Sequence, residues 1–153
     1  MCGLLWVLCS ILTGVLTCVL AGFLPLFRFQ RPGLRAWEDS VGLPFNELVE
    51  RLRDLLGVRL VAYIGGVKST RRVSDWAAGA NRPAAVEQER LQHAFHAAAV
   101  LRERYDAATV QSWFQGLNPS LGDVSPASLL ATGDPAEVAG DLLAAAKSFA
   151  YVG

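Results

Sequence analysis

Apolar residues recur every three or four positions through most of the chain after residue 45, and this is the spacing of amphipathic α-helices. A first helix is expected before Gly57 and a second one after it. No segment alternates apolar and polar residues as a half-buried strand does, so the pattern predicts an all-α fold. The expected inward positions are Leu48, Leu52, Leu55 and Leu56 in the first helix and Leu60, Val61 and Ile64 in the second.

A double glycine at positions 65 and 66 separates the second helix from a short basic helix that is expected to begin near Ser69. Glycine permits a sharp turn that residues with a Cβ atom resist. The positions expected to face inward are Val73, Trp76 and Ala77, and those left exposed are Lys68, Thr70, Arg71, Arg72, Ser74 and Asp75.

Two helices joined by a glycine-containing turn form the helix-turn-helix motif, whose second helix lies in the major groove of DNA. The sequence therefore predicts double-stranded DNA as a partner. The alternative is a plain three-helix bundle, because any small bundle can carry a short basic helix with a solvated face. The residues expected to contact DNA are Lys68, Ser69, Thr70, Arg71, Arg72, Ser74 and Arg82.

The longest helix is expected from Ala84 to Tyr105, after Pro83, since proline favours the first turn of a helix. It would connect the two halves of the protein. Its alanine-rich face could also pack against a second copy, which would make the protein a homodimer or a higher oligomer. The apolar stripe of this helix comprises Leu91, Ala94, Phe95, Ala98, Leu101 and Tyr105.

Three further helices are expected after residue 105, and each has a recognisable start. Asp106 can cap the first, Ser125 precedes a proline at the second, and Asp134 precedes a proline at the third. The expected apolar positions of these helices are Val110, Trp113, Phe114, Leu129, Leu130, Val138, Leu142, Ala146 and Phe149.

The first 27 residues differ from the rest, because the run from Leu4 to Phe27 contains no charged side chain. Its length suits a transmembrane helix. Three arginines follow it, at positions 28, 31 and 35, so the positive-inside rule would leave the remainder in the cytoplasm. A start codon assigned too far upstream is the alternative. The protein is thus expected in the cytoplasm, either unattached or anchored in the cytoplasmic membrane by one N-terminal helix with the C-terminus inside.

The formal net charge of zero hides an uneven distribution along the chain. Residues 51–104 hold ten lysines and arginines against five carboxylates, whereas residues 105–153 hold one lysine against five. The predicted helix-turn-helix lies in the basic part, which suits a polyanionic partner. The acidic part is expected to have another role.

The sequence offers no catalytic constellation. All three cysteines lie within the first 18 residues, so neither a disulfide nor a cysteine-ligated zinc is expected in the rest of the chain. His93 and His96 have a spacing that could serve a metal, but no third ligand accompanies them. Without a serine-histidine-aspartate order, a glycine-rich phosphate loop or paired carboxylates, we expect neither an enzyme nor a cofactor.

The segment WFQGLNPSLGDVSPASLLATGDPAEVAGDLLAAAKSF resembles the C-terminal domain of the Xre/MbcA/ParS family of antitoxins. That family has a tryptophan-aromatic pair, an Asn-Pro loop, a proline-started helix that ends in Leu-Leu, and a closing amphipathic helix. The segment from about residue 45 to 83 is similar to the helix-turn-helix half of the same proteins. The residues at matching positions are Trp113, Phe114, Asn118, Pro119, Leu121, Gly122, Ser125, Pro126, Leu129 and Leu130.

The resemblance implies an antitoxin that binds an operator with its first half and blocks a RES-type, NAD-consuming toxin with its second half. The last helix and the tail from residue 149 to 153 would then cover the entrance to the toxin's NAD site. For Trp113 and Phe114, a place in the core is favoured over a contact with the toxin. The residues implied in toxin binding are Trp113, Asn118, Pro119, Leu121, Phe149 and Tyr151.

The predicted organisation has five parts. An apolar segment covers 1–27, a linker 28–44, a helix-turn-helix domain 45–83, a connecting or dimerisation helix 84–105, and a toxin-binding helical domain 106–153. A different function remains open, in which a membrane-tethered helix-turn-helix regulator uses its C-terminal domain to bind a partner other than a toxin.

Overall fold

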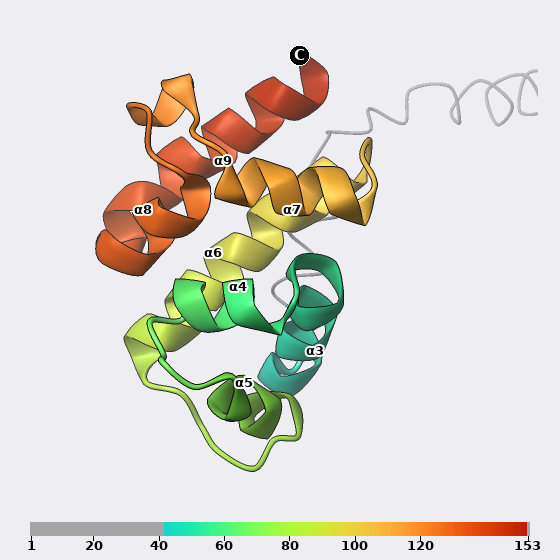
Figure 1. The fold of residues 1–153 in the computed structure, drawn as a ribbon, viewed down its shortest axis with the longest axis vertical. Coiled ribbons are helices and arrows are strands. Elements are labelled where there is room, and N and C mark those ends of the chain that lie inside the picture. Colours follow the sequence, from blue (N-terminus) through green and yellow to red (C-terminus); the bar gives the residue numbers. More distant parts are fainter. Residues whose placement is uncertain (1–41, 153) are drawn as a thin grey trace, which may run out of the picture. The chain divides into compact units, whose positions relative to one another are not determined.

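The computed structural model describes residues 42–152, which all belong to one compact unit (Figure 1). Over this range the chain is helical and has no strand, which confirms the predicted all-α class; one isolated β-bridge joins Asn118 to Val124. The predicted apolar segment and most of the linker lie outside the described residues. The elements are α3 (Phe45–Leu56), α4 (Val58–Ile64), α5 (Thr70–Ala77), α6 (Ala85–Arg102), α7 (Ala107–Gln115), a 3₁₀ turn η2 (Pro119–Leu121), α8 (Pro126–Thr132) and α9 (Pro135–Tyr151).

Helices α3, α4 and α5 pack against one another in all three pairings. Val73 and Trp76 project from α5 into this group and are fully buried, as the apolar spacing predicts. Three residues expected to face inward are only half-buried against the core: Leu55, Leu60 and Ala77. They lie at the edges of their helices' apolar stripes, where contact with the core is partial.

The two glycines between α4 and α5 are needed for different reasons. Gly66 has a φ of +70°, a left-handed conformation that side chains with a Cβ atom disfavour. Gly65 has an ordinary helical conformation, but a Cβ atom there would lie 3.2 Å from Cζ3 of Trp76. Only Gly66 therefore supports the prediction of a turn that needs glycine, while Gly65 makes room for the Trp76 ring.

Helix α6 packs most extensively on α9 and also contacts α3, α4, α7 and α8 (Figure 1). It begins at Ala85, so Pro83 precedes the helix and is not in its first turn. The Glu87 carboxylate accepts a hydrogen bond of 2.9 Å from the backbone N–H of Ala84, which stabilises this helix start.

The alanine-rich face of α6 is covered within the protomer. Ala94, Ala97 and Ala98 are all buried in the core. Small side chains let helices approach closely, and here the helix that packs most extensively on α6 is α9 of the same chain. The expectation that this face binds a second copy therefore does not fit the structure, and a dimer would have to use another surface.

The helices after residue 105 begin where the sequence predicts. Side-chain oxygens of Asp106, Ser125 and Asp134 each accept a backbone N–H at the start of α7, α8 and α9, over 2.8, 3.2 and 2.9 Å. The hydrogen bonds that Asp106 receives from Thr109 hold the pKa of its carboxyl below the usual range. These caps give all three side chains a structural role.

The predicted DNA-binding and toxin-binding segments share one hydrophobic core, to which Trp76, Phe114, Leu130 and Leu142 all contribute. Helix α3 contacts α7, and α4 contacts α8. The Gln111 side chain on α7 also donates a hydrogen bond of 3.0 Å to the backbone oxygen of Leu56, at the end of α3.

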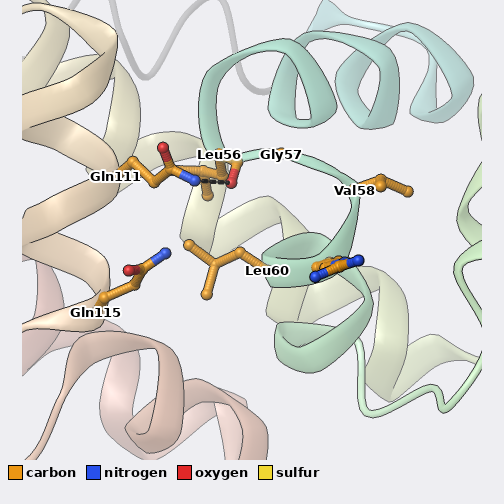
Figure 2. A pocket seen from close by; sticks show the side chains of 7 residues that line it. Leu56, Gly57, Val58, Leu60, Gln111 and Gln115 are labelled. Carbon is orange, nitrogen blue, oxygen red and sulfur yellow. Dashed lines mark hydrogen bonds between the residues drawn. The ribbon is translucent and has the colours of Figure 1, made fainter.

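This hydrogen bond borders a chiefly apolar pocket of about 340 Å³ (Figure 2). Leu56, Gly57, Val58, Arg59 and Leu60 line one side, and Gln111 and Gln115 line the other. Within residues 42–152, no helix has the length and apolar character needed to cross a bilayer.

Candidate functional site

All residues predicted to bind DNA are exposed, and most lie on or next to α5. The burial of Val73 and Trp76 fixes the orientation of this helix, because both side chains point into the core and the opposite face must point outward. Ser69 is the N-cap, and its hydroxyl accepts a hydrogen bond of 3.3 Å from the backbone N–H of Arg71. The structure brings together Lys68, Ser69, Thr70, Arg71, Arg72 and Ser74, while Arg82 lies in the segment between α5 and α6.

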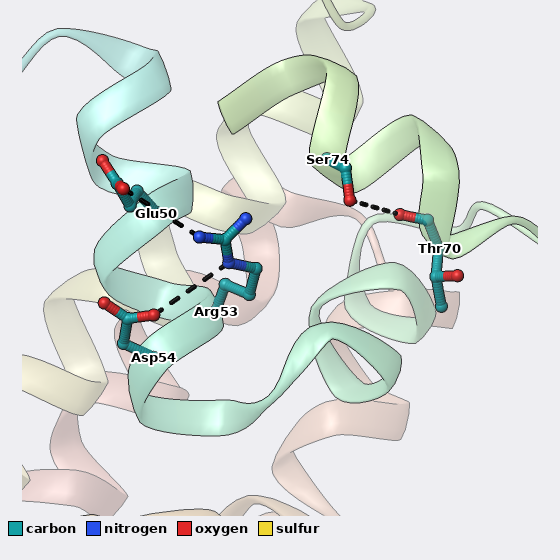
Figure 3. A network of polar contacts seen from close by, with 5 residues as sticks. All are labelled: Glu50, Arg53, Asp54, Thr70 and Ser74. Atoms are coloured by element: carbon teal, nitrogen blue, oxygen red, sulfur yellow. Dashed lines mark hydrogen bonds and ion pairs between the residues drawn. The ribbon is translucent and has the colours of Figure 1, made fainter. Parts of the chain in front are cut away.

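Arg53 on α3 and Arg71 on α5 differ in whether they pair with a carboxylate; Figure 3 shows the polar contacts of Arg53 and of Ser74 on α5. The Ser74 hydroxyl donates a long hydrogen bond of 3.4 Å to the backbone oxygen of Thr70. On α3, Arg53 lies between two carboxylates, 3.9 Å from Glu50 and 4.0 Å from Asp54. Arg53 is thus neutralised by its own helix, whereas Arg71 has no side-chain ion pair or hydrogen bond within residues 42–152.

Arg71 and Arg72 are adjacent in sequence but differ in their surroundings. An Nη atom of Arg72 lies 3.9 Å from a carboxylate oxygen of Glu87 on α6. Its guanidinium carbon also lies 5.8 Å from the centroid of the Trp76 ring, within the range of a cation-π contact. Arg72 is therefore held against the protein, and Arg71 is the arginine of this pair that can extend toward a ligand.

The residues predicted to bind a toxin have mixed surroundings. Trp113 is only 8% exposed, and its ring centroid lies 5.2 Å from that of Phe114. Trp113 thus occupies the core, which was the role favoured for it from the sequence, and it does not offer a contact surface. Leu121 is half-buried against the same core.

The loop between α7 and α8 is held in a defined shape by its own hydrogen bonds. The Asn118 side chain accepts a bond of 3.0 Å from the backbone N–H of Ser120, and its backbone N–H donates one of 3.2 Å to the oxygen of Val124. Pro119 is exposed at the start of η2. Asn118 and Pro119 therefore shape the loop.

This loop exposes an apolar side chain that sequence analysis did not select. Leu117 is 75% exposed, and Val124 across the β-bridge is exposed as well. In the sequence, Leu117 stands just before an Asn-Pro pair and belongs to none of the apolar stripes that the sequence predicts. This was the only indication that Leu117 could be exposed. Together Leu117 and Val124 form an apolar loop surface, which is a common feature of protein contacts.

The end of α9 is docked on the chain itself. The Tyr105 hydroxyl donates a hydrogen bond of 3.0 Å to the backbone oxygen of Phe149, and the two ring centroids are 4.9 Å apart. Tyr151 donates to the Glu103 carboxylate, and Arg104 lies over the Tyr151 ring. Partial burial, followed by the bond to Glu103, raises the pKa of Tyr151 to about 12.

These contacts change the picture of the predicted tail. Phe149, expected both as an inward residue and as a toxin contact, is 37% exposed and presents one edge to solvent. Tyr151 is half-buried, and only Val152 is largely exposed at the end of the described chain. Residues 149–151 are thus part of the folded surface and not a free extension.

His93 and His96 lie half-buried on α6. No group of three or more potential ligands suited to a metal exists among residues 42–152. Burial is the main cause that lowers the pKa of each imidazole below its usual value of 6.5. The Glu89 carboxylate opposes this effect at His93, whereas Lys147 on α9 adds to it at His96.

Acidification is expected to weaken the packing around α6, because a lowered pKa means that folding favours the neutral imidazole. The stabilisation from both histidines is complete above the usual pKa of 6.5 and is lost as the pH falls below it. The free energy of unfolding, measured by urea denaturation, should therefore be lower at about pH 5.5 than at about pH 7.5. This difference should shrink when His93→Gln and His96→Gln are combined, and an equal difference in that variant would contradict the assignment.

Comparisons of the chain with models of protein families, with curated proteins and with solved structures found no match.

Proposed function

We propose that this chain is an antitoxin of the Xre/MbcA/ParS type, which binds operator DNA and neutralises a RES-type, NAD-consuming toxin by direct contact. The observation that carries the proposal is the two-sided character of α5. Its apolar side, with Val73 and Trp76, is fully buried, and its outer side presents hydroxyls and Arg71, whose guanidinium has no partner in the described part of the chain.

The DNA-binding part comprises α4, the glycine turn and α5, which together form a helix-turn-helix. The N-terminal residues of the second helix of this motif contact base edges. Thr70 and Arg71 occupy the first turn of α5, and Ser74 lies one turn further on the exposed side. An arginine can donate two hydrogen bonds to guanine, while threonine and serine hydroxyls can contact any base.

The toxin-binding part combines negative charge with an exposed apolar loop. Residues 105–153 carry five carboxylates against one lysine. Asp123 lies within the same loop as Leu117 and Val124, and the three side chains are all exposed. A toxin that holds a dinucleotide phosphate in a basic cleft would be attracted by the charge, and the apolar side chains would provide the dehydrated contact.

Co-expression with a RES-type toxin encoded beside this chain should preserve cellular NAD. Leu117→Asp should reduce this protection, because a carboxylate in the middle of an apolar contact is left without a partner. Arg71→Ala serves as the matched control and should protect as well as the unaltered chain. The measurement is cellular NAD after toxin induction, and undiminished NAD loss with the unaltered antitoxin would refute the toxin-binding function.

A second candidate, a membrane-tethered regulator, is favoured by the uncharged run from Leu4 to Phe27. Both candidates require the same DNA-binding surface. Fractionation of cells that express the native gene separates them, because a tethered regulator would sediment with membranes and an untethered antitoxin would not.

A further inference from the structure

Arg90, on the second turn of α6, has an unusual environment for an arginine. It is half-buried, its Nε atom is fully enclosed without a hydrogen-bond acceptor, and its guanidinium has no ion pair within residues 42–152. The nearby carboxylate one turn earlier, Glu87, already accepts the N–H of Ala84 and pairs with Arg72. The charge of Arg90 is therefore not balanced by the described part of the protein.

A guanidinium stays protonated in proteins, so Arg90 cannot avoid the cost of burial by losing its charge. Partial burial of an unpaired cation is unfavourable, and a bound anion would offset this cost. Exposed arginines such as Arg71 need no such explanation, because water solvates them fully.

The position of Arg90 indicates which anion would bind. Its Nη1 atom would lie 3.0 Å from a Cβ atom placed on Gly66, so the guanidinium rests against the turn between α4 and α5. The exposed Lys68 follows two residues later and leads into α5. A side chain at position 66 would be strained by the positive φ and would also displace the Arg90 side chain.

We propose that Arg90 binds a backbone phosphate of DNA at the Gly65–Gly66 turn, beside the helix that contacts the bases. The inference rests on the proposed DNA-binding function and adds a contact from α6, a helix that was expected to connect the two halves or to form a dimer but not to bind DNA. Phosphate contacts from arginine fix how a protein sits on the duplex without selecting its sequence. Arg90 would thus contribute affinity, while Arg71 contributes sequence preference.

The unaltered protein first selects a duplex from a random library. The test then measures how binding of the full chain depends on salt, both for this duplex and for a scrambled one. Arg90→Gln should make the slope of log K against log salt shallower by about 0.9, the value for one lost phosphate contact. Affinity should fall by a similar factor for both duplexes. Arg90→Lys should keep the slope, and Arg102→Gln, at the far end of α6, should change nothing.

A second measurement compares each protein only with itself on different duplexes, so a general loss of affinity in the variant cancels. Single uncharged methylphosphonate linkages are placed along the selected duplex, and each is tested with the unaltered protein. At one position the methylphosphonate should weaken DNA binding by the unaltered protein. The same substitution should not change DNA binding by Arg90→Gln, because the guanidinium that contacts this phosphate is already absent.

The role of Arg90 would be overturned if Arg90→Gln kept the slope of log K against log salt and if no methylphosphonate position affected only the unaltered protein. If Arg71→Ala still reduced the sequence preference in that case, the proposed DNA-binding function would stand. If the unaltered protein selected no sequence and bound neither duplex, both proposals would fail.

Discussion

Replacing Arg71 with alanine is expected to reduce the sequence preference of DNA binding strongly while leaving the fold intact. Arg71 is exposed in the first turn of α5, and its guanidinium has no partner within residues 42–152, so its loss removes no contact of the folded chain. A good arginine-guanine pair contributes about 1–3 kcal/mol of discrimination, or a factor of roughly 5 to 150 in relative affinity. The measurement compares affinities for a selected and a scrambled duplex, with circular dichroism as the check on helicity.

Arg72→Ala is the matched control for this experiment. Because Arg72 is engaged with Glu87 and the Trp76 ring, its removal should lower affinity for both duplexes slightly and keep the preference between them. If Arg71→Ala kept the full preference, or if Arg72→Ala abolished it, the assignment of Arg71 as the base-contacting arginine would be incorrect.

Replacing Trp76 with alanine should destabilise the protein by about 3–5 kcal/mol, the usual cost of removing a buried aromatic side chain. Trp76 is 1% exposed and packs against Gly65, so the surrounding backbone cannot easily close the cavity. This loss is comparable to the whole stability of many domains, and cooperative unfolding near room temperature is expected. Urea denaturation followed by circular dichroism measures it.

Trp76→Phe is the milder comparison, since it keeps an aromatic ring whose packing has only to shift. It should cost clearly less than Trp76→Ala. A small effect of Trp76→Ala, similar to that of a surface substitution, would mean that this side chain does not form the centre of the core formed by α3, α4 and α5.

Helix positions and their buried faces could be predicted because they depend on local spacing. The inward placement of Val73 and Trp76 follows from a repeat of 3.6 residues, and the caps at Asp106, Ser125 and Asp134 depend on residues two or three positions away. The basic face of α5 could be predicted for the same reason.

Contacts between distant parts of the chain could not be predicted. The pairing of Arg72 with Glu87, and the approach of Arg90 to Gly66, both depend on how α6 returns across the glycine turn. Sequence spacing therefore treated Arg71 and Arg72 as equivalent and did not select Arg90.

The shared core has a consequence for how the protein would be removed from a cell. Helices α3 and α4 pack on α7 and α8, and Phe114 and Leu142 lie in the same apolar interior as Trp76. A protease that cut after Arg102 would expose this interior and so unfold the N-terminal helices as well. Under the proposed antitoxin function, degradation begun at the C-terminal end would then release the operator DNA and the toxin in one event, with no surviving half to bind either.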